Sequence, residues 1–285
     1  MRKKIFITFG DEKFKKARKY CALSARIFGG FDKVITFTPD DIENDFLIKF
    51  DNIFKIKRGY GLWLWKPYII YKTLKDIANE GDMLFYCDAG AIMFRNINYI
   101  EDVMGKDDIW VSFIPLIEWQ FTKKDAFSIL NCDKVEYKNS PQIQGGFIYL
   151  RKSKKSMELV KEWLNNCCNI NLLHPNNILT GYPNPKGFVE HREDQSILSL
   201  LCKKHGIQAH LDPTQFSLFP ERYYLFIRAL PCLMKNSRRE YPVCIILHRS
   251  PFCSLYILFK EILFLFIPQI WGRKFIFWKA KRRNR

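Results

Sequence analysis

The sequence predicts an α/β fold: a mostly parallel central sheet flanked by helices, followed by a C-terminal amphipathic helical tail. Three observations support this. The chain opens with a strand, a helix and a strand; the apolar run 83–87 stops at an acidic turn; and residues 252–278 are unusually apolar before a basic end. With 285 residues, 48% hydrophobic and 26% charged, a packed core is expected. We predict one domain over residues 1–250 and a tail over 251–285.

The opening segments set the fold class. Ile5 to Phe9 is an apolar, β-rich run that ends at a Gly-Asp turn, and apolar residues recur at helical spacing over 12–28 until a Gly-Gly pair stops the helix. Residues 32–38 then read as a second strand. A strand, a helix and a strand in this order are typical of a parallel α/β sheet.

The remaining elements follow from the same patterns. Pro in the first turn favours a helix over 67–78. Residues 169–188, rich in Asn, Pro and Gly, are expected to form a loop. Further strands are predicted at 83–87, 109–114, 146–150 and 207–211, and further helices at 154–165 and 191–205.

Charge and cysteine content narrow the function classes. Lys and Arg number 46 and Asp and Glu 29, so the net charge of +17 favours anionic partners: nucleic acid, acidic lipid headgroups or phosphorylated substrates. The nine cysteines are odd in number and form no repeated CxxC pattern, which indicates reduced thiols in the cytosol. The apolar stretch near the N-terminus is too short for a signal peptide.

Asp88 is the strongest single candidate for chemistry. It follows the buried strand 83–87, and ligands of open α/β sheets bind at the carboxyl ends of strands. A carboxylate there can hold a divalent cation that neutralises a diphosphate. Gly90 would let the backbone approach a ligand closely. The alternative is a turn in which Asp88 only caps the backbone.

The segment 58–67 combines two glycines, three large aromatic residues and two cations before a helix start. Tyr60 and Trp65 can stack on a base, and Lys66 can reach a phosphate at the helix N-terminus. The alternative is a turn packed against the core by its tryptophans.

Three later features of the sequence are weaker evidence for functional residues. Gln144 with Gly145 and Gly146 would suit a sugar, because amides bond hydroxyls and glycines permit close approach. Asp194, at a helix start, is a candidate to bind acceptor or to stabilise positive charge at an anomeric carbon, although dipole complementarity alone predicts an acid there. His248 could complete a metal site or touch phosphate; a lone His is often structural.

The order of these features resembles the GT-A superfamily of nucleotide-diphospho-sugar transferases, especially bacterial enzymes of capsule or lipopolysaccharide synthesis. Residues 58–91 carry most of the likeness, GFIYLRKS and HREDQS add to it, and it covers about residues 1–250. The resemblance implies these roles: Thr8, Phe9 and Gly10 near the base, Lys66 and His248 at the diphosphate, Asp88 at the metal and ribose, Gln144, Gly145 and Gly146 on the donor sugar, and Asp194 and Gln195 at the reaction centre.

The resemblance also implies a divalent cation, Mn²⁺ or Mg²⁺, held by Asp88 and His248. However, Gly90 stands where the superfamily usually has the second acid of its D-x-D pattern. With one carboxylate, the cation is held weakly, completed by His248, or replaced by the cations Lys66 and Arg58.

The tail over 252–278 is interrupted by Lys260, Glu261 and Pro268, so it is poorly suited to span a bilayer. We expect it to lie in the membrane interface, with Trp271 and Trp278 at headgroup depth and its basic end on anionic lipid. A buried core helix and a spanning helix are the alternatives. The expected location is cytoplasmic, peripheral on the inner face of the membrane.

The function expected from these features is glycosyl transfer from a nucleotide sugar, with a UDP-sugar as first choice, to a glycan or lipid-linked saccharide in surface polysaccharide synthesis. A nucleic-acid-binding protein is disfavoured, because the densest basic cluster adjoins the most apolar segment. A membrane-binding protein without catalysis is a further alternative. A sugar-phosphate nucleotidyltransferase is disfavoured, because FGDEKFKK after the first strand has one glycine.

Overall fold

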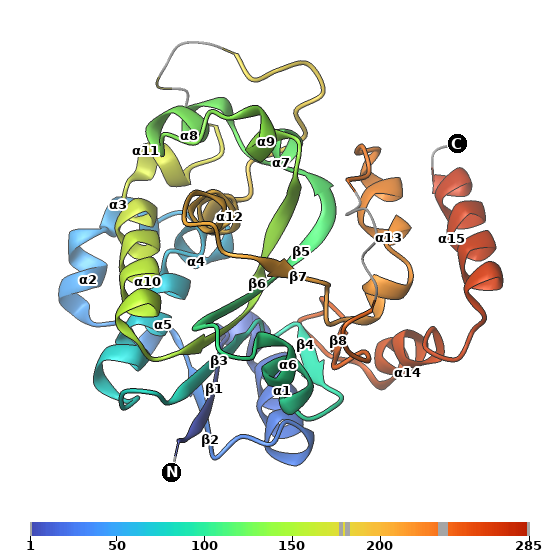
Figure 1. The fold of residues 1–285 in the computed structure, drawn as a ribbon, viewed down its shortest axis with the longest axis horizontal. Helices are drawn as coiled ribbons and strands as arrows, with labels where there is room; N and C mark the ends of the chain where they lie inside the picture. The colour runs from blue at the N-terminus through green and yellow to red at the C-terminus, as the bar shows by residue number, and fades with distance from the viewer. Residues whose placement is uncertain (1, 177–178, 180–182, 233–238, 284–285) are drawn as a thin grey trace.

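The chain is described from a computed structural model, which covers residues 2–176, 179, 183–232 and 239–283. Within these residues, six strands form a central sheet in the order β2-β1-β3-β6-β5-β7 (Figure 1). Neighbouring strands are parallel except at β6, which runs antiparallel to both β3 and β5. The prediction of a mostly parallel sheet is therefore confirmed. The strands are β1 (Lys4–Phe9), β2 (Lys33–Phe37), β3 (Met83–Cys87), β5 (Ile109–Ile117), β6 (Pro141–Arg151) and β7 (Ala209–His210).

Side chains alternate between the two faces of the sheet, as strand geometry requires. In β1, Ile5 and Ile7 face one apolar cluster and Phe6 faces the other. The first cluster is covered by α3 (Asp51–Phe54), α5 (Trp65–Asp76), α8 (Lys124–Ile129), α10 (Lys154–Cys167), α11 (Ile170–Leu173) and α12 (Glu193–Lys204). The second is covered by α1 (Lys15–Phe28), α6 (Asn98–Met104) and α13 (Glu221–Tyr224).

A small second sheet pairs two distant segments. β4 (Ala91–Met93) runs antiparallel to β8 (Ile245–Leu247), so the chain after β8 returns to the end of β3. The amides of His248 and Arg249 both donate to the carbonyl of Gly90 at 2.9 Å. Residues near 249 thereby become neighbours of Asp88.

The short remaining elements connect these layers. They are the helices α2 (Asn44–Lys49), α4 (Gly59–Leu62), α7 (Glu118–Phe121) and α9 (Val135–Lys138), and the 3-10 turns η1 (Glu12–Phe14), η2 (Pro39–Asp41), η3 (Gln215–Leu218) and η4 (Leu225–Ile227).

Predicted and observed elements differ most at β6. The predicted strand 146–150 is only its second half, because the preceding Pro-Gln-Ile-Gln-Gly carries little of the β-branched pattern that marks a strand. Helix α5 begins at Trp65, two residues before the predicted start, and Pro67 lies in its first turn. The predicted loop 169–188 contains the short helix α11; residues 177–178 and 180–182 of that loop lie outside the described residues.

The predicted tail forms α14 (Leu255–Leu263), which lies beside β8, and α15 (Gln269–Arg283), which lies beside α13 and η4 (Figure 1). One side of the tail packs on the domain. Glu261 is buried and pairs with Arg222, and Gly272 lies against the ring of Phe219. In the described part of the chain, no helix is both long and apolar enough to cross a bilayer. Asn284 and Arg285, at the predicted basic end, lie outside the described residues.

Candidate active site

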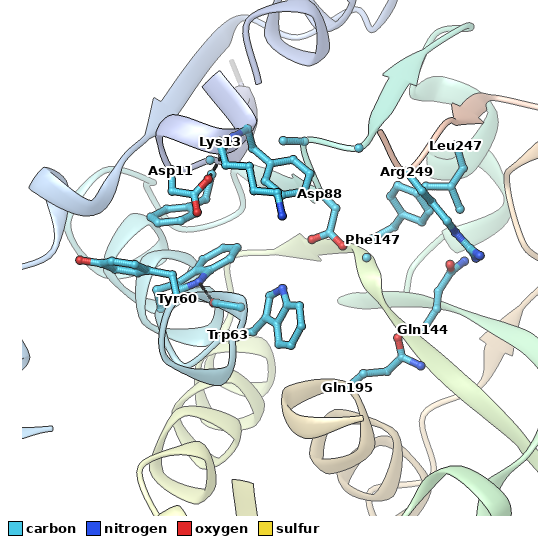
Figure 2. A pocket seen from close by; sticks show the side chains of 18 of the residues that line it. Asp11, Lys13, Tyr60, Trp63, Asp88, Gln144, Phe147, Gln195, Leu247 and Arg249 are labelled. Carbon is cyan, nitrogen blue, oxygen red and sulfur yellow. Dashed lines mark hydrogen bonds between the residues drawn. The ribbon is translucent and has the colours of Figure 1, made fainter. Parts of the chain in front are cut away.

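A pocket of about 520 Å³ opens at the sheet edge where β1 and β3 end (Figure 2). Because β6 is antiparallel to β3, its first half reaches the same edge, and Cys87 pairs with Phe147. Gly10 and Asp11 follow β1, and Asp88 follows β3, so the pocket lies where ligands of α/β sheets bind.

The structure brings most of the expected residues to this pocket. The predicted residues that line it are Phe9, Gly10, Tyr60, Trp65, Asp88, Gly90, Gln144, Gly146 and Gln195. The predicted residues that do not line it are Thr8, Lys66, Gly145, Asp194 and His248. Thr8, Lys66 and Asp194 are buried behind the lining.

A left-handed turn forms the aromatic wall of the pocket. Such a turn costs roughly 1–2 kcal/mol for each residue with a side chain, and strain of this kind often marks functional sites. The indole of Trp65 holds it: Nε1 donates to the carbonyl of Gly59 at 2.8 Å, and the ring stacks on Phe9 at 3.8 Å. The φ angle is positive at five consecutive residues: Gly59 (59°), Tyr60 (50°), Gly61 (81°), Leu62 (54°) and Trp63 (60°).

The carboxylate of Asp88 is fixed from several sides. Its backbone amide donates to the carbonyl of Gly146 at 2.9 Å, and the Tyr86 hydroxyl donates to its Oδ1. A Cβ at position 146 would lie 3.3 Å from Oδ2 of Asp88, a tight contact that the carboxylate would have to relieve by a small shift. Gly146 therefore lets β6 pass close to this carboxylate, and Gly145 lets it pass close to Gln195.

Lys66 joins Asp88 to the start of α12. It is 3% exposed, and its Nζ lies 3.0 Å from Oδ2 of Asp194 and 3.5 Å from Oδ1 of Asp88. Nζ also donates to the carbonyl of Gly145 at 3.1 Å. Burial alone would lower the pKa of Lys66, but the two carboxylates outweigh it and the net direction is upward. Lys66 is thus a buried cation, behind the pocket surface.

The first turn of α12 carries the other groups of this centre. Burial raises the pKa of Asp194 to about 6, although Lys66 opposes the shift. Burial likewise raises the pKa of Glu193 to about 7, against the opposing charge of Arg58, whose Nε lies 2.7 Å from its Oε1. Arg58 therefore pairs with a carboxylate and is not among the residues that line the pocket.

Gln195 presents a fixed amide to the pocket. Its Oε1 accepts from the amide of Gly145 at 3.0 Å, and its Nε2 donates to Oε1 of Gln142 at 2.7 Å. Since the carbonyl oxygen has a second lone pair, it can still meet a developing positive charge in the pocket.

Few side chains near Asp88 could act as ligands for the expected divalent cation. His248 Nδ1 accepts from the amide of Ser250 at 3.1 Å, and burial lowers the pKa of His248 to about 4. Leu247 and Arg249 line the pocket, whereas His248 does not. Over the described residues, no group of three or more His, Cys, Asp or Glu side chains could hold a metal. With Lys66 already beside Asp88, these donors do not fit a metal site built by the protein alone.

Several lining residues were not predicted. They are Asp11, Lys13, Phe14, Lys57, Gly59, Trp63, Ala89, Phe147, Leu247 and Arg249. Arg249 was adjacent to a predicted residue, and Gly59 and Trp63 lay inside a segment already singled out. Nothing in the sequence distinguishes Lys13 and Lys57 from the other Lys and Arg residues, which number 46 in all.

The lining is ordered along the pocket (Figure 2). Lys13, Tyr60 and Trp63 lie on one side, Gln144 and Arg249 lie on the other, and Asp88 lies between them. Such an arrangement suits an elongated ligand with an aromatic ring and an anionic group toward one end and a polar group at the other.

Comparisons with known proteins support a fold for this chain but do not place it in a family. No family model matches the chain, and no curated protein matches it. Among solved structures, an active-site mutant of LgtC matches with 12% identity and a TM-score of 0.50, over 95% of this chain and 99% of its own.

Two further structures are similar at lower scores. The galactosyltransferase LgtC, solved with donor and acceptor sugar analogs, has 12% identity and a TM-score of 0.46, over 88% of this chain and 87% of its own. The bifunctional WbbM glycosyltransferase has 8% identity and a TM-score of 0.45, over 75% of this chain and 39% of its own, so this chain spans well under half of WbbM. The likeness to the LgtC mutant confirms the predicted GT-A fold.

Proposed function

We propose that this chain is a glycosyltransferase that moves a sugar from a nucleoside-diphosphate sugar to a hydroxyl of an acceptor. The observation that carries the proposal is the ordered lining of the pocket at the carboxyl edge of a GT-A sheet. Its volume of about 520 Å³ lies in the range of small-molecule sites.

Each part of the donor has a partner in this arrangement. The base would stack between Tyr60 and Trp63, and Lys13 and Lys57 would attract the diphosphate. The sugar would then lie by Asp88, Gln144 and Gln195. These roles extend the expected ones: Lys13 and Lys57 take the diphosphate role expected of Lys66, which supports the carboxylates from behind.

The reaction breaks the bond between the anomeric carbon and the diphosphate oxygen, and the electron pair leaves with the nucleoside diphosphate. The acceptor oxygen forms the new bond, and its hydroxyl proton passes to the leaving diphosphate. Positive charge on the sugar would be met by the carboxylate of Asp88 and the carbonyl dipole of Gln195, and negative charge on the leaving group by the lysines. Because the donors do not fit a protein-held cation, no step is assigned to one.

The finer expectations remain proposals. A UDP-sugar is the first donor to test, and a glycan or lipid-linked saccharide the first acceptor. LgtC and WbbM are glycosyltransferases, and a role in lipopolysaccharide or capsule synthesis rests on the resemblance of residues 58–91 to enzymes of those pathways.

Donor binding tests the proposal directly. Thermal unfolding would be followed with a panel of UDP-, GDP-, CMP- and dTDP-sugars, because a ligand that binds only the folded state raises its stability. We expect one nucleotide to raise the melting temperature in the wild type and to lose this effect in Trp63→Ala. A panel in which no member protects the fold would contradict the proposal.

We further propose that the tail docks on an anionic membrane surface, at the inner face of the membrane. On α14 and the segment after it, Phe259 and Phe266 are 66% and 75% exposed, and Trp271 on α15 is 68% exposed. Lys274 lies over the ring of Trp271, and Arg282 lies over the ring of Trp278. Exposed aromatic rings beside basic side chains match the headgroup region of an anionic bilayer.

Point substitutions test this better than removal of the tail, because Glu261 and Gly272 contribute to packing on the domain. Phe266→Asp with Trp271→Asp should abolish sedimentation with phosphatidylglycerol vesicles and leave the melting temperature unchanged. Equal binding to vesicles of neutral lipid, or unchanged sedimentation of the variant, would refute docking on an anionic surface.

A further inference from the structure

A second pocket, of about 390 Å³, adjoins the first. Three arginines line it, Arg192, Arg222 and Arg249, together with aromatic and aliphatic side chains that include Phe226 and Ile227. Arg249 lines both pockets, so the two cavities meet at its side chain.

Two of the three arginines are anchored by acids. Arg222 donates through both terminal nitrogens to Glu261 at 2.7 and 2.8 Å, and lies 3.9 Å above the ring of Phe216. Arg192 lies with its Nε 3.0 Å from Glu190. These contacts fix both guanidinium groups at the pocket, where a mobile cation would be a poorer binding partner.

Arg249 has no such anchor. It is exposed, and across the described residues no acidic side chain lies within ion-pair distance of it. Its guanidinium lies 4.7 Å from the ring centre of Phe216 and 5.2 Å from that of Tyr223. The pocket therefore gathers three cations against two carboxylates. Burial lowers the pKa of Arg192, and the charge of Arg249 also acts in that direction.

The position of the second pocket relates it to the chemistry of the first. Arg192 immediately precedes Glu193, Asp194 and Gln195 at the start of α12. A molecule held by Arg192 and Arg249 would therefore lie next to Gln195, on the side of the first pocket opposite Tyr60 and Trp63.

We propose that the second pocket is the acceptor site, and that it recognises an oxyanion group of the acceptor, a phosphate or a carboxylate. This assignment rests on the proposed glycosyl transfer. Guanidinium groups bind such oxyanions through paired hydrogen bonds. Phe226 and Ile227 give the same pocket an apolar side, and Glu261, which anchors Arg222, belongs to the tail helix α14.

Calorimetric titration of the full chain tests the assignment, with the first pocket saturated by the nucleotide found in the donor panel. The probes are geranyl phosphate, the methyl glycoside of glucuronic acid, and their neutral counterparts geraniol and methyl glucoside. The variants are Arg192→Gln and Arg249→Lys, with Arg228→Gln as the control. Arg228 is an exposed neighbour that is not part of the pocket lining.

We expect an oxyanion probe to bind the wild type and Arg228→Gln equally. Loss of a charged hydrogen bond in Arg192→Gln should weaken that binding roughly tenfold to a hundredfold, while Arg249→Lys, which keeps the charge, loses less. Preference for geranyl phosphate would assign a lipid-linked phosphate, and preference for the glucuronide an acidic sugar.

The assignment is overturned if neutral probes bind as tightly as anionic ones, or if Arg192→Gln binds the anionic probe like the wild type. Nucleotide binding is measured separately on the same proteins. If no nucleotide binds, the proposed transferase function fails, and the titrations without nucleotide still decide whether the pocket takes an oxyanion.

Discussion

The ammonium of Lys66 lies 3.0 Å from the carboxylate of Asp194, and both side chains are buried behind the candidate active site. The pair links two walls of the pocket, because Lys66 also approaches Asp88 and bonds the carbonyl of Gly145. A buried pair of this kind contributes mainly by fixing geometry, since desolvation offsets much of its attraction.

Removal of one partner should therefore be costly. Lys66→Met leaves Asp194 buried without its cation, and we expect the free energy of unfolding to fall by about 3–5 kcal/mol. Denaturant titration measures this change. In the double variant Lys66→Met with Asp194→Leu, part of the loss should return. If the free energy of unfolding falls in the double variant by the sum of its losses in the two single variants, Lys66 and Asp194 are not coupled.

Glu193 should make stability depend on pH. Its pKa is raised from 4.5 to about 7 by burial, so the folded state holds this proton more tightly than the unfolded state. Its contribution to stability is full below the unfolded pKa and is lost as pH rises through about 7. The free energy of unfolding should fall between these values in the wild type and fall less in Glu193→Gln. Equal slopes in both proteins would show that Glu193 is not responsible.

The left-handed turn should be needed for donor binding. In Gly59→Ala, a Cβ would lie 2.4 Å from the ring of Trp63. We expect donor binding in the thermal-shift panel to be lost, along with roughly 1–2 kcal/mol of stability. Gly206→Ala is the matched control: its φ is +64° and nothing lies within 4 Å, so it should lose only the stability that the left-handed backbone costs and keep donor binding. Equal donor binding in both variants would count against the turn's role.

Chelation should have little effect on turnover, because Lys66 lies beside the single carboxylate Asp88 and His248 is not part of the pocket lining. We expect nucleotide release in EDTA to remain within about twofold of the rate with Mn²⁺, and Lys13→Ala to lower it by tenfold or more. Complete loss in EDTA, restored by Mn²⁺, would instead support the cation expected from the resemblance.

Sequence patterns predicted those parts of the site that depend on local signals. The strand 83–87 is apolar throughout and stops at an acid, so both the element and Asp88 could be placed. The Gly-Gly pair at 145–146 could also be identified in the sequence, but the sequence does not show why glycine occupies these two positions. The reason depends on how closely β6 passes Asp88 and Gln195, which is a tertiary relationship.

Other features needed the folded chain. Lys66 was expected to face a diphosphate and lies buried between two carboxylates, because α5 and α12 pack on the same face of the sheet. The three arginines of the second pocket come from the residue before α12, from α13 and from the segment after β8. No spacing along the sequence relates these three positions, so this second site could not be predicted from the chain alone.

Nucleotide release from the donor panel by the purified chain, compared with Asp88→Asn and with Asp133→Asn, tests whether sugar transfer takes place in this pocket. Asp133 is exposed and is not part of the pocket lining, so its variant controls for the loss of one charge. We expect release from one nucleotide sugar by the wild type and by Asp133→Asn, and a fall of at least about tenfold in Asp88→Asn. Release that is equal in all three proteins would contradict the placement of the reaction in this pocket.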